Sequence, residues 1–213
     1  AADPSFTAAD IVTNAANAQD VKVADMDGDG DLDLVSASPT DDSVAWYENN
    51  GAADPSFTKA VIATSADEVR NIDLADMDGD GDLDVITGSY GHISVGPTFP
   101  TFPTFPWNPF FPFPGIGVPQ DGDGAGIRVY SNDGQGSFTS NTIVGSAGAK
   151  YTRTVAVADL DRDRDLDIVF VQDRTVNRIA WIPNNGNGTY DSVRVVTQED
   201  DLFPRTFDIG DLD

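Results

Sequence analysis

Hydrophobic residues recur along the chain in short blocks that alternate with polar residues. Four segments, VKVAD, IDLAD, VAVAD and FDIGD, carry apolar side chains two and four positions before an aspartate. These apolar pairs are Val21 and Val23, Ile72 and Leu74, Val155 and Val157, and Phe207 and Ile209. A period of two is that of a β-strand, not of a helix. Each segment is therefore predicted to be a strand that ends at an acidic loop.

Three further strands are predicted after each acidic loop that the chain completes. The second strands, LDLVSAS, LDVITGS and LDIVFVQ, are apolar on both faces, as expected for strands packed between neighbouring sheets. The third strands are SVAWYENNG, GIRVYSNDG and NRIAWIPNNG, and each closes on Asn-Gly or Asp-Gly, which favours a tight hairpin turn. The fourth strands are SFTKAVIAT, SFTSNTIVG and TYDSVRVVT.

The acidic loops define an internal repeat. They begin at Asp25, Asp76, Asp159 and Asp211, so the spacings are 51, 83 and 52 residues, and the middle spacing contains an insertion of about 32 residues. Four short antiparallel strands at this period are typical of the blades of a β-propeller. A β-solenoid is the alternative architecture, but its coils are usually shorter.

The repeat predicts an all-β fold, a β-propeller with three complete four-stranded antiparallel blades and partial blades at both ends. Residues 1–13 nearly copy the fourth strand at 52–64 and are predicted to be the outer strand of a preceding blade. The blades are then 14–66, 67–148 with an insertion at about 91–123, and 149–202, and residues 203–213 begin a further blade. Because these pieces do not close a ring and open blade edges aggregate, we expect a longer propeller or an assembly partner that supplies the missing strands.

The acidic loops concentrate negative charge. The sequence DMDGDGDLD occurs twice and DLDRDRDLD once, and these loops hold 15 aspartates of a chain with 36 acidic and 12 basic residues. Two carboxylates 4 Å apart repel by roughly 1 kcal/mol even in water, and a bound cation reverses the sign of that cost. The net charge of −24 argues against nucleic acid as a partner.

The ligand types in the loops indicate a hard cation. The chain has no cysteine and no histidine near the loops, and oxygen ligands on a loop of variable geometry suit Ca²⁺ better than Mg²⁺. An EF-hand is the competing interpretation. It requires a carboxylate at position 12 and flanking helices, whereas position 12 is Ser36 or Thr87 here and the flanking segments are predicted strands.

The loop, strand order and period together resemble the calcium loops of FG-GAP repeats, also called VCBS repeats, as in integrin α-subunit propellers. The resemblance implies calcium ligands from the side chains at loop positions 1, 3, 5 and 9 and from the backbone carbonyl at position 7. These residues are Asp25, Asp27, Asp29, Asp33 and Asp31 in the first loop; Asp76, Asp78, Asp80, Asp84 and Asp82 in the second; and Asp159, Asp161, Asp163, Asp167 and Asp165 in the third.

The third loop departs from the family pattern because Arg162 and Arg164 replace both glycines. We expect a third calcium site there; the alternative is a turn whose carboxylates pair with these arginines. Extracellular calcium modules bind at roughly 10⁻⁴ to 10⁻³ M, so the sites predict a secreted or cell-surface protein. Asn187 lies in an Asn-Gly-Thr triplet that fits N-glycosylation. No apolar run reaches transmembrane length.

The insertion, GPTFPTFPTFPWNPFFPFPGIGVPQ, holds 8 of the 13 prolines and 6 of the 12 phenylalanines. Its Thr-Phe-Pro triplets favour polyproline II, and it is expected to leave from the end opposite the calcium loops. We interpret it as a docking arm for a protein partner or for self-assembly, with contacts from Phe99, Phe102, Phe105, Trp107, Phe110, Phe111 and Phe113. The alternatives are an arm folded over its own propeller and a disordered or glycosylated stalk.

Little in the sequence points to catalysis. His92 is the only histidine, and a lone histidine in a surface loop is usually an ordinary polar residue. Trp46 and Trp181 occupy equivalent places on third strands, where they either pack the blade or stack on sugars. We therefore expect a non-enzymatic, calcium-stabilised extracellular propeller for adhesion or assembly. The alternative is a glycan-binding module or the accessory propeller of a carbohydrate-active enzyme, with glycans as ligands.

Overall fold

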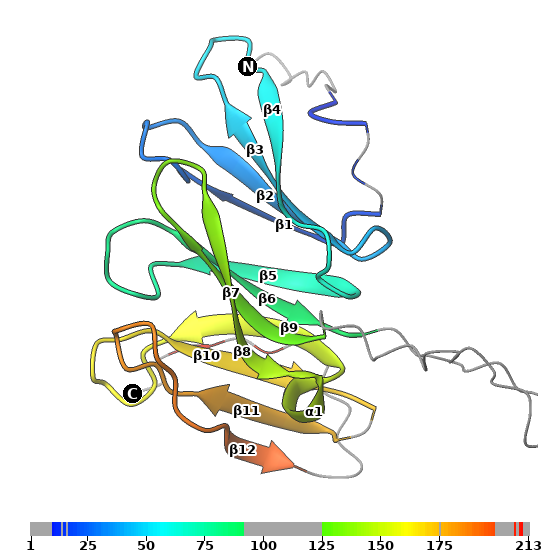
Figure 1. Ribbon diagram of the computed structural model, residues 1–213, viewed down its shortest axis with the longest axis vertical. Helices are drawn as coiled ribbons and strands as arrows, with labels where there is room; N and C mark the ends of the chain where they lie inside the picture. Colours follow the sequence, from blue (N-terminus) through cyan, green and yellow to red (C-terminus); the bar gives the residue numbers. More distant parts are fainter. Residues whose placement is uncertain are drawn as a thin grey trace, which may run out of the picture.

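The protein folds into three four-stranded antiparallel sheets, in each of which the strands follow one another in chain order. This computed structural model describes residues 10–13, 15, 17–91, 125–174, 176–198, 207 and 209–210. In Figure 1 the sheets lie one after another along the long axis of the molecule, from the blue and cyan first sheet to the yellow and orange third sheet. The predicted all-β fold of four-stranded antiparallel units is thus confirmed.

The strands of each sheet have the following bounds. The first sheet contains β1 (Asp20–Ala24), β2 (Asp33–Ser38), β3 (Ser43–Asn49) and β4 (Phe57–Ala63). The second contains β5 (Val69–Ala75), β6 (Asp84–Ser89), β7 (Gly126–Asn132) and β8 (Phe138–Gly145). The third contains β9 (Thr152–Ala158), β10 (Asp167–Gln172), β11 (Arg178–Ile182) and β12 (Arg194–Gln198).

The structure differs from the sequence prediction in two details. A one-turn helix, α1 (Ser146–Ala149), joins the second and third sheets, which the strand pattern did not predict. The last strand begins at Arg194, although the pattern of TYDSVRVVT predicted a strand from Thr189. β11 ends before Pro183 because proline has no N–H to donate, and Tyr190 makes only an isolated bridge to Asn184.

The predicted outer strand at residues 1–13 lies largely outside the described residues. Its described part, residues 10–13, forms no strand. None of the helices in the described part of the chain has the length and apolar character needed to cross a membrane.

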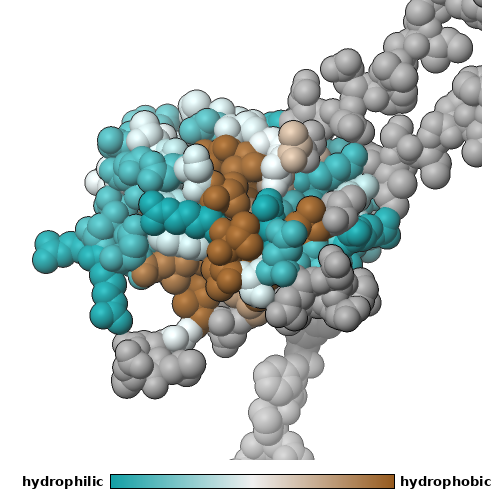
Figure 2. Space-filling model, turned by 90° about the horizontal axis from the view of Figure 1, so that it is seen from below, coloured by the Kyte–Doolittle hydropathy of each residue, from teal (hydrophilic) through white to brown (hydrophobic). Residues whose placement is uncertain are grey.

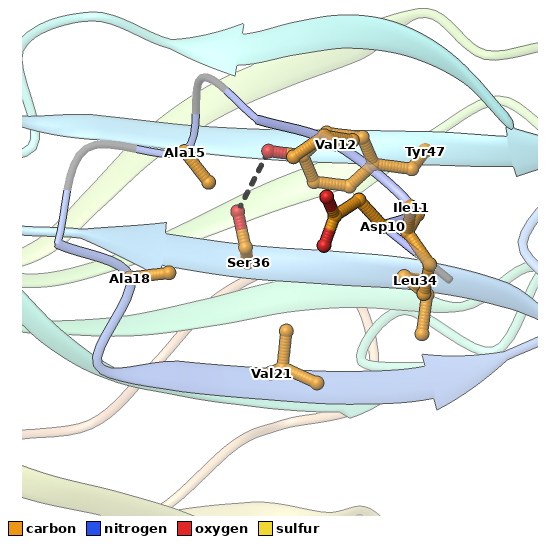
Figure 3. A pocket seen from close by; sticks show the side chains of 9 residues that line it. All are labelled: Asp10, Ile11, Val12, Ala15, Ala18, Val21, Leu34, Ser36 and Tyr47. Carbon is orange, nitrogen blue, oxygen red and sulfur yellow. Dashed lines mark hydrogen bonds between the residues drawn. The ribbon is translucent and has the colours of Figure 1, made fainter. Parts of the chain in front are cut away.

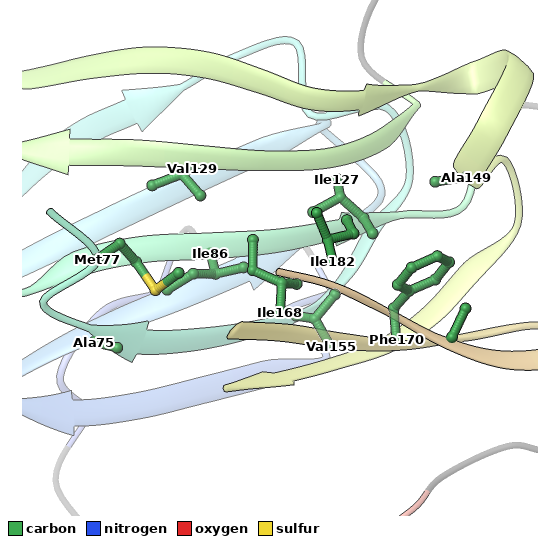
Figure 4. Packing of buried hydrophobic residues seen from close by; sticks show 11 residues of the cluster. Ala75, Met77, Ile86, Ile127, Val129, Ala149, Val155, Ile168, Phe170 and Ile182 are labelled. Carbon is green, nitrogen blue, oxygen red and sulfur yellow. The ribbon is translucent and has the colours of Figure 1, made fainter. Parts of the chain in front are cut away.

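Each second strand is buried on both faces, as its sequence pattern predicted. Every residue of β6 and β10 is buried. One face of β10 packs against the second sheet, where Ile168 and Phe170 lie among side chains that include Ile86, Ile127 and Ile182 (Figure 4). A second core, which includes Val35, Val44, Trp46, Ile72 and Tyr130, lies between the first and second sheets. The sheets are therefore held together face to face by apolar side chains.

Polar bonds join the first strands of neighbouring sheets. Asp20 of β1 accepts hydrogen bonds from the side-chain amide of Asn71 at 2.7 Å and from the backbone N–H of Ile72 at 2.9 Å, both on β5. Asn71 in turn accepts one from the N–H of Val155 on β9 at 2.7 Å. Among the described strands, the fourth strands of neighbouring sheets share no comparable contact. Each sheet is therefore joined to the next along its first strand.

The packing between the second and third sheets predicts a large effect for Phe170→Ala. The ring is fully buried, so its removal should lower the free energy of unfolding by about 3–5 kcal/mol in urea titrations followed by circular dichroism. Val196→Ala is the control, since Val196 is 62% exposed and should change stability by less than about 0.5 kcal/mol. Equal losses for the two variants would contradict this arrangement of the core.

Candidate metal centres

Three nine-residue acidic loops connect the first and second strands of the sheets, at residues 25–33, 76–84 and 159–167. They project from the same side of the molecule, on the left in Figure 1. In each loop one oxygen from each of three carboxylates lies within 4.8 Å of the others. The groups are Asp25, Asp27 and Asp29; Asp76, Asp78 and Asp84; and Asp159, Asp161 and Asp167.

The structure thus brings the side chains at positions 1 and 3 together in every loop, joined by position 5 in the first loop and by position 9 in the second and third. All of these residues belong to the ligand set that the sequence predicted. A set of carboxylate oxygens with no nitrogen or sulfur is the chemistry of a calcium site. The donor set therefore fits Ca²⁺, and coordination by these residues stays a prediction.

The carboxylate at position 1 shapes its own loop. Asp76 accepts hydrogen bonds from the N–H groups of Gly79 at 2.7 Å and Gly81 at 3.0 Å. Both glycines have positive φ angles, 81° and 99°, which turn their amides back toward the carboxylate. Asp25 is held in the same way by the corresponding glycines of the first loop. The loop backbone is therefore wound around the residue that would be the first ligand.

The carboxylate at position 9 fastens the loop to the sheet. Asp33, Asp84 and Asp167 are at most 1% exposed. Asp84 accepts hydrogen bonds from the N–H of Met77 in its own loop and from the N–H of Asn132 at the end of β7, both at 2.9 Å. A carboxylate has about four acceptor sites, so these two bonds leave capacity for a cation.

The side chains at position 7 point away from the carboxylate clusters. A Cβ atom added at Gly51, Gly134 or Gly186 would clash with the carboxylate of Asp31, Asp82 or Asp165, respectively. Each position-7 side chain therefore lies against the glycine of the turn between the third and fourth strands of its own sheet. This orientation is compatible with the expectation that position 7 contributes its backbone carbonyl.

In the second loop, burial and mutual repulsion make the carboxyl groups of Asp78 and Asp84 harder to ionise without a cation. Burial raises the pKa of Asp84 to about 6, against hydrogen bonds from Asn132 and Met77 that lower it, and Asp78 and Asp80 raise it further. Burial also raises the pKa of Asp78, and its neighbour Asp80 adds to the shift. A divalent cation would favour the ionised forms and remove this cost.

The FG-GAP-like repeat family matches residues 25–87 and 116–170, which is more than half of the chain and includes the three acidic loops. The chain belongs to this family. FG-GAP repeats are associated with adhesion and with extracellular propeller domains, and the family is generally non-enzymatic. No curated protein matches the chain.

The third acidic loop of this FG-GAP-repeat protein differs from the other two at positions 4 and 6. Arg162 and Arg164 adopt the positive φ angles, 67° and 86°, that glycines adopt in the other loops, which is a costly conformation for a residue with a side chain. In the described part of the chain neither arginine forms an ion pair with the loop; Arg194 approaches Asp161 instead, at 3.9 Å. The proposed pairing of the loop's own arginines with its carboxylates therefore has no support.

Sequence reasoning missed a role for the asparagines at the ends of the third strands. Asn132 and Asn184 donate side-chain hydrogen bonds to the carbonyls of Met26 at 2.7 Å and Met77 at 2.8 Å, each in the acidic loop of the preceding sheet. The available signal was an asparagine two residues before the glycine in ENNG, SNDG and PNNG. On its own, this pattern predicts only a tight turn.

The other predicted site residues have varied surroundings. Asn187 is exposed in the turn between β11 and β12, where its side-chain oxygen accepts a hydrogen bond from the Thr189 hydroxyl at 2.6 Å. Its glycosylation stays a prediction. The residues predicted to contact a partner lie outside the described part of the chain, as does His92: Phe99, Phe102, Phe105, Trp107, Phe110, Phe111 and Phe113.

The raised pKa of Asp84 predicts opposite pH dependences with and without calcium. In chelator, the folded state binds a proton below about pH 6 and the unfolded state only near 3.8. Stability should therefore rise by about 1 kcal/mol as pH falls from 7 to 5, and the full gain of about 3 kcal/mol is reached only below pH 3.8. With saturating calcium, stability should fall over the same range because protons compete with the ion. Melting temperatures at each pH measure both trends, and the exposed control Asp54→Asn should preserve them. The same trend in both conditions would contradict the assignment.

The arginines of the third loop predict that exchanging arginine and glycine between the second and third loops changes the calcium affinity of each loop in opposite directions. Arg162→Gly with Arg164→Gly should raise the calcium affinity of the third loop, because the double change removes backbone strain and two positive charges. Gly79→Arg with Gly81→Arg should lower the calcium affinity of the second loop. A Cβ atom at either glycine meets no atom within 4 Å, so a steric clash at Cβ would not account for a lower affinity. Isothermal titration calorimetry would measure each change, and unaltered affinities would refute the explanation.

Proposed function

We propose that this FG-GAP-repeat protein is a calcium-stabilised, non-enzymatic extracellular β-propeller, or a section of one, that serves adhesion or assembly. The observation that carries the proposal is the convergence of carboxylate oxygens within 4.8 Å in three successive loops on one side of the molecule. A propeller is supported by the hydrogen bonds that join successive first strands, β1 to β5 and β5 to β9. Strands joined in this way would line the central axis, with each sheet as a blade.

The exposed face of the first sheet supports the presence of further repeats. Val21, Val23 and Val61 are 51%, 55% and 55% exposed on strands whose other face is partly buried against the second sheet. Ile11 and Val12 lie over part of this face and line a cavity of about 290 Å³ with Leu34 and Tyr47 (Figure 3). A hydrophobic band also crosses the end of the molecule formed by the third sheet (Figure 2). We propose that further four-stranded repeats cover both faces, from the same chain or from a neighbouring subunit.

The root of the insertion is firmly anchored. Tyr90 is 2% exposed, and its hydroxyl donates a hydrogen bond to Asp173 of the third sheet at 2.9 Å. The guanidinium group of Arg70 lies 4.3 Å from the centre of the Tyr90 ring, and those of Arg153 and Arg174 also lie over it. Such cation–π contacts stabilise partly buried sites. Tyr90 directly precedes the insertion, so the insertion leaves the sheets from a fixed point. We propose the insertion as the element that contacts a partner.

The glycan-binding alternative is weakened by the surroundings of the tryptophans. Trp46 is 5% exposed and packs edge-to-face on Phe138, with 6.4 Å between the ring centres. The guanidinium group of Arg194 lies 4.9 Å from the centre of the Trp181 ring. Sugar stacking needs an open aromatic face. The surroundings of both tryptophans therefore favour packing within the sheets over sugar stacking.

Calcium dependence can be separated from assembly in one experiment. Wild type should melt at a higher temperature in calcium than in chelator. At a free calcium concentration of 100 times Kd, each site should add about 2.7 kcal/mol to the free energy of unfolding. Deletion of residues 97–114 should abolish self-association in analytical ultracentrifugation and leave the calcium-induced stabilisation intact. The control is Asp78→Asn, which should reduce the calcium-induced stabilisation and leave self-association through the insertion unchanged.

Two results would contradict the proposal. Equal melting temperatures in calcium and chelator would remove the structural role of the ion. Saturable binding on a glycan array that requires Trp46 or Trp181, without any effect of the deletion, would favour the carbohydrate-binding alternative.

A further inference from the structure

Hydrogen bonds connect the first acidic loop to the second across the junction between their sheets. The side-chain amide of Asn132, at the end of β7, donates to the carbonyl of Met26 in the first loop at 2.7 Å. The backbone N–H of the same asparagine donates to Asp84 of the second loop at 2.9 Å. Asp84 also accepts from the N–H of Met77 at 2.9 Å. One asparagine therefore bonds to two candidate cation sites.

The same connection joins the second loop to the third. The side-chain amide of Asn184, just after β11, donates to the carbonyl of Met77 at 2.8 Å. Its backbone N–H donates to Asp167 at 3.0 Å, and Asp167 accepts from the N–H of Leu160 at 2.9 Å. The N–H of Met77 bonds to Asp84 and its carbonyl bonds to Asn184. Met77 thus joins the two junctions into one continuous series of hydrogen bonds that runs from the first loop to the third.

The series is shielded from water at both junctions. The exposed fractions are 2% for Met26 and Met77, 3% for Asn132, 1% for Asn184 and 0% for Asp84 and Asp167. Buried hydrogen bonds are stronger than exposed ones, and breaking one leaves an unsatisfied polar group. A shift of one loop therefore cannot occur without cost to its neighbour.

Asn49 occupies the equivalent place in the first sheet but makes no such crossing bond in the described part of the chain. Its side-chain amide donates to the carbonyl of Leu32, within its own sheet, at 3.1 Å. Asn184 makes the equivalent bond to Leu166 at 3.1 Å, in addition to its bond with Met77. Asn49 and Asn184 also accept similar bonds, from the N–H groups of Gly51 and Gly186, both at 3.2 Å. The two asparagines therefore differ in the bond that crosses between sheets.

We infer that Asn132 and Asn184 are positioning residues that couple neighbouring acidic loops, so that a cation in one loop raises the affinity of the loop in the preceding sheet. The inference rests on the proposed calcium binding. Each crossing bond holds the carbonyl between loop positions 1 and 3, so it fixes the peptide that separates two candidate ligands. By linkage, the coupling acts equally in both directions.

The test uses the amides of loop glycines as separate reporters in two-dimensional ¹H–¹⁵N NMR during calcium titration. The N–H of Gly28 bonds to Asp25 and reports on the first loop, and that of Gly79 bonds to Asp76 and reports on the second. Asn184→Ala should weaken calcium binding at Gly79 by about 10- to 100-fold, as is typical for residues that orient metal ligands. The matched control Asn49→Ala loses the equivalent bonds within its sheet but no bond between sheets, so it should lower the affinity at Gly79 by much less than Asn184→Ala does.

A second arm measures the coupling itself. Asp161→Asn, which impairs the third loop without touching the series of bonds, should lower the affinity reported by Gly79 in the wild-type background. The same change should have no effect at Gly79 in the Asn184→Ala background. This double-mutant cycle distinguishes coupling through Asn184 from a general loss of negative charge, since charge loss would act equally in both backgrounds.

The outcomes are distinct. Loop amides of the wild type that do not respond to calcium would refute the proposed calcium binding itself. If the wild type responds, an unchanged affinity at Gly79 in folded Asn184→Ala overturns the inference. Should Asn184→Ala fail to fold, Asn132→Ala decides at the other junction: weaker binding at Gly28 supports the inference, and an unchanged affinity at Gly28 in the folded variant overturns it.

Discussion

The structure depends on how nine-residue loops accommodate five aspartates each. The carboxylates at positions 1 and 9 accept hydrogen bonds from backbone amides, and these bonds give the loop its shape and join it to the sheet. In each loop the carboxylate at position 3 converges with the one at position 1 and with a third at position 5 or 9, so these groups repel one another. Such a loop is folded but electrostatically unfavourable until a cation binds. The strands on either side are connected through this turn, so its stability affects the whole sheet.

The two ends of the sheets carry different chemistry. The end with the acidic loops concentrates aspartates and also holds the asparagines that connect successive sheets. At the other end, Arg70, Arg153 and Arg174 surround Tyr90 at the root of the insertion. Under the proposed function, cations would bind at the acidic end of the sheets, and a partner would be contacted from the opposite end.

Local patterns were sufficient to predict the strands and the acidic loops. The alternation in VKVAD or IDLAD depends only on neighbouring residues, and so does the spacing of the aspartates. The role of Asn132 could not be found in this way, because its partner Met26 is 106 positions away and its bond depends on the stacking of two sheets. The late start of β12 follows from a competition between the strand propensity of TYDSVRVVT and the missing N–H of Pro183, which the alternation alone does not decide.

The most direct test is the number of calcium ions that each chain holds. Equilibrium dialysis against buffered calcium, with the metal measured by atomic emission, should give about three ions per chain, one for each group of converging carboxylates. Asp27→Asn with Asp78→Asn should reduce that number to about one. A wild-type protein that retains no calcium at millimolar free concentration and remains fully folded would contradict the account.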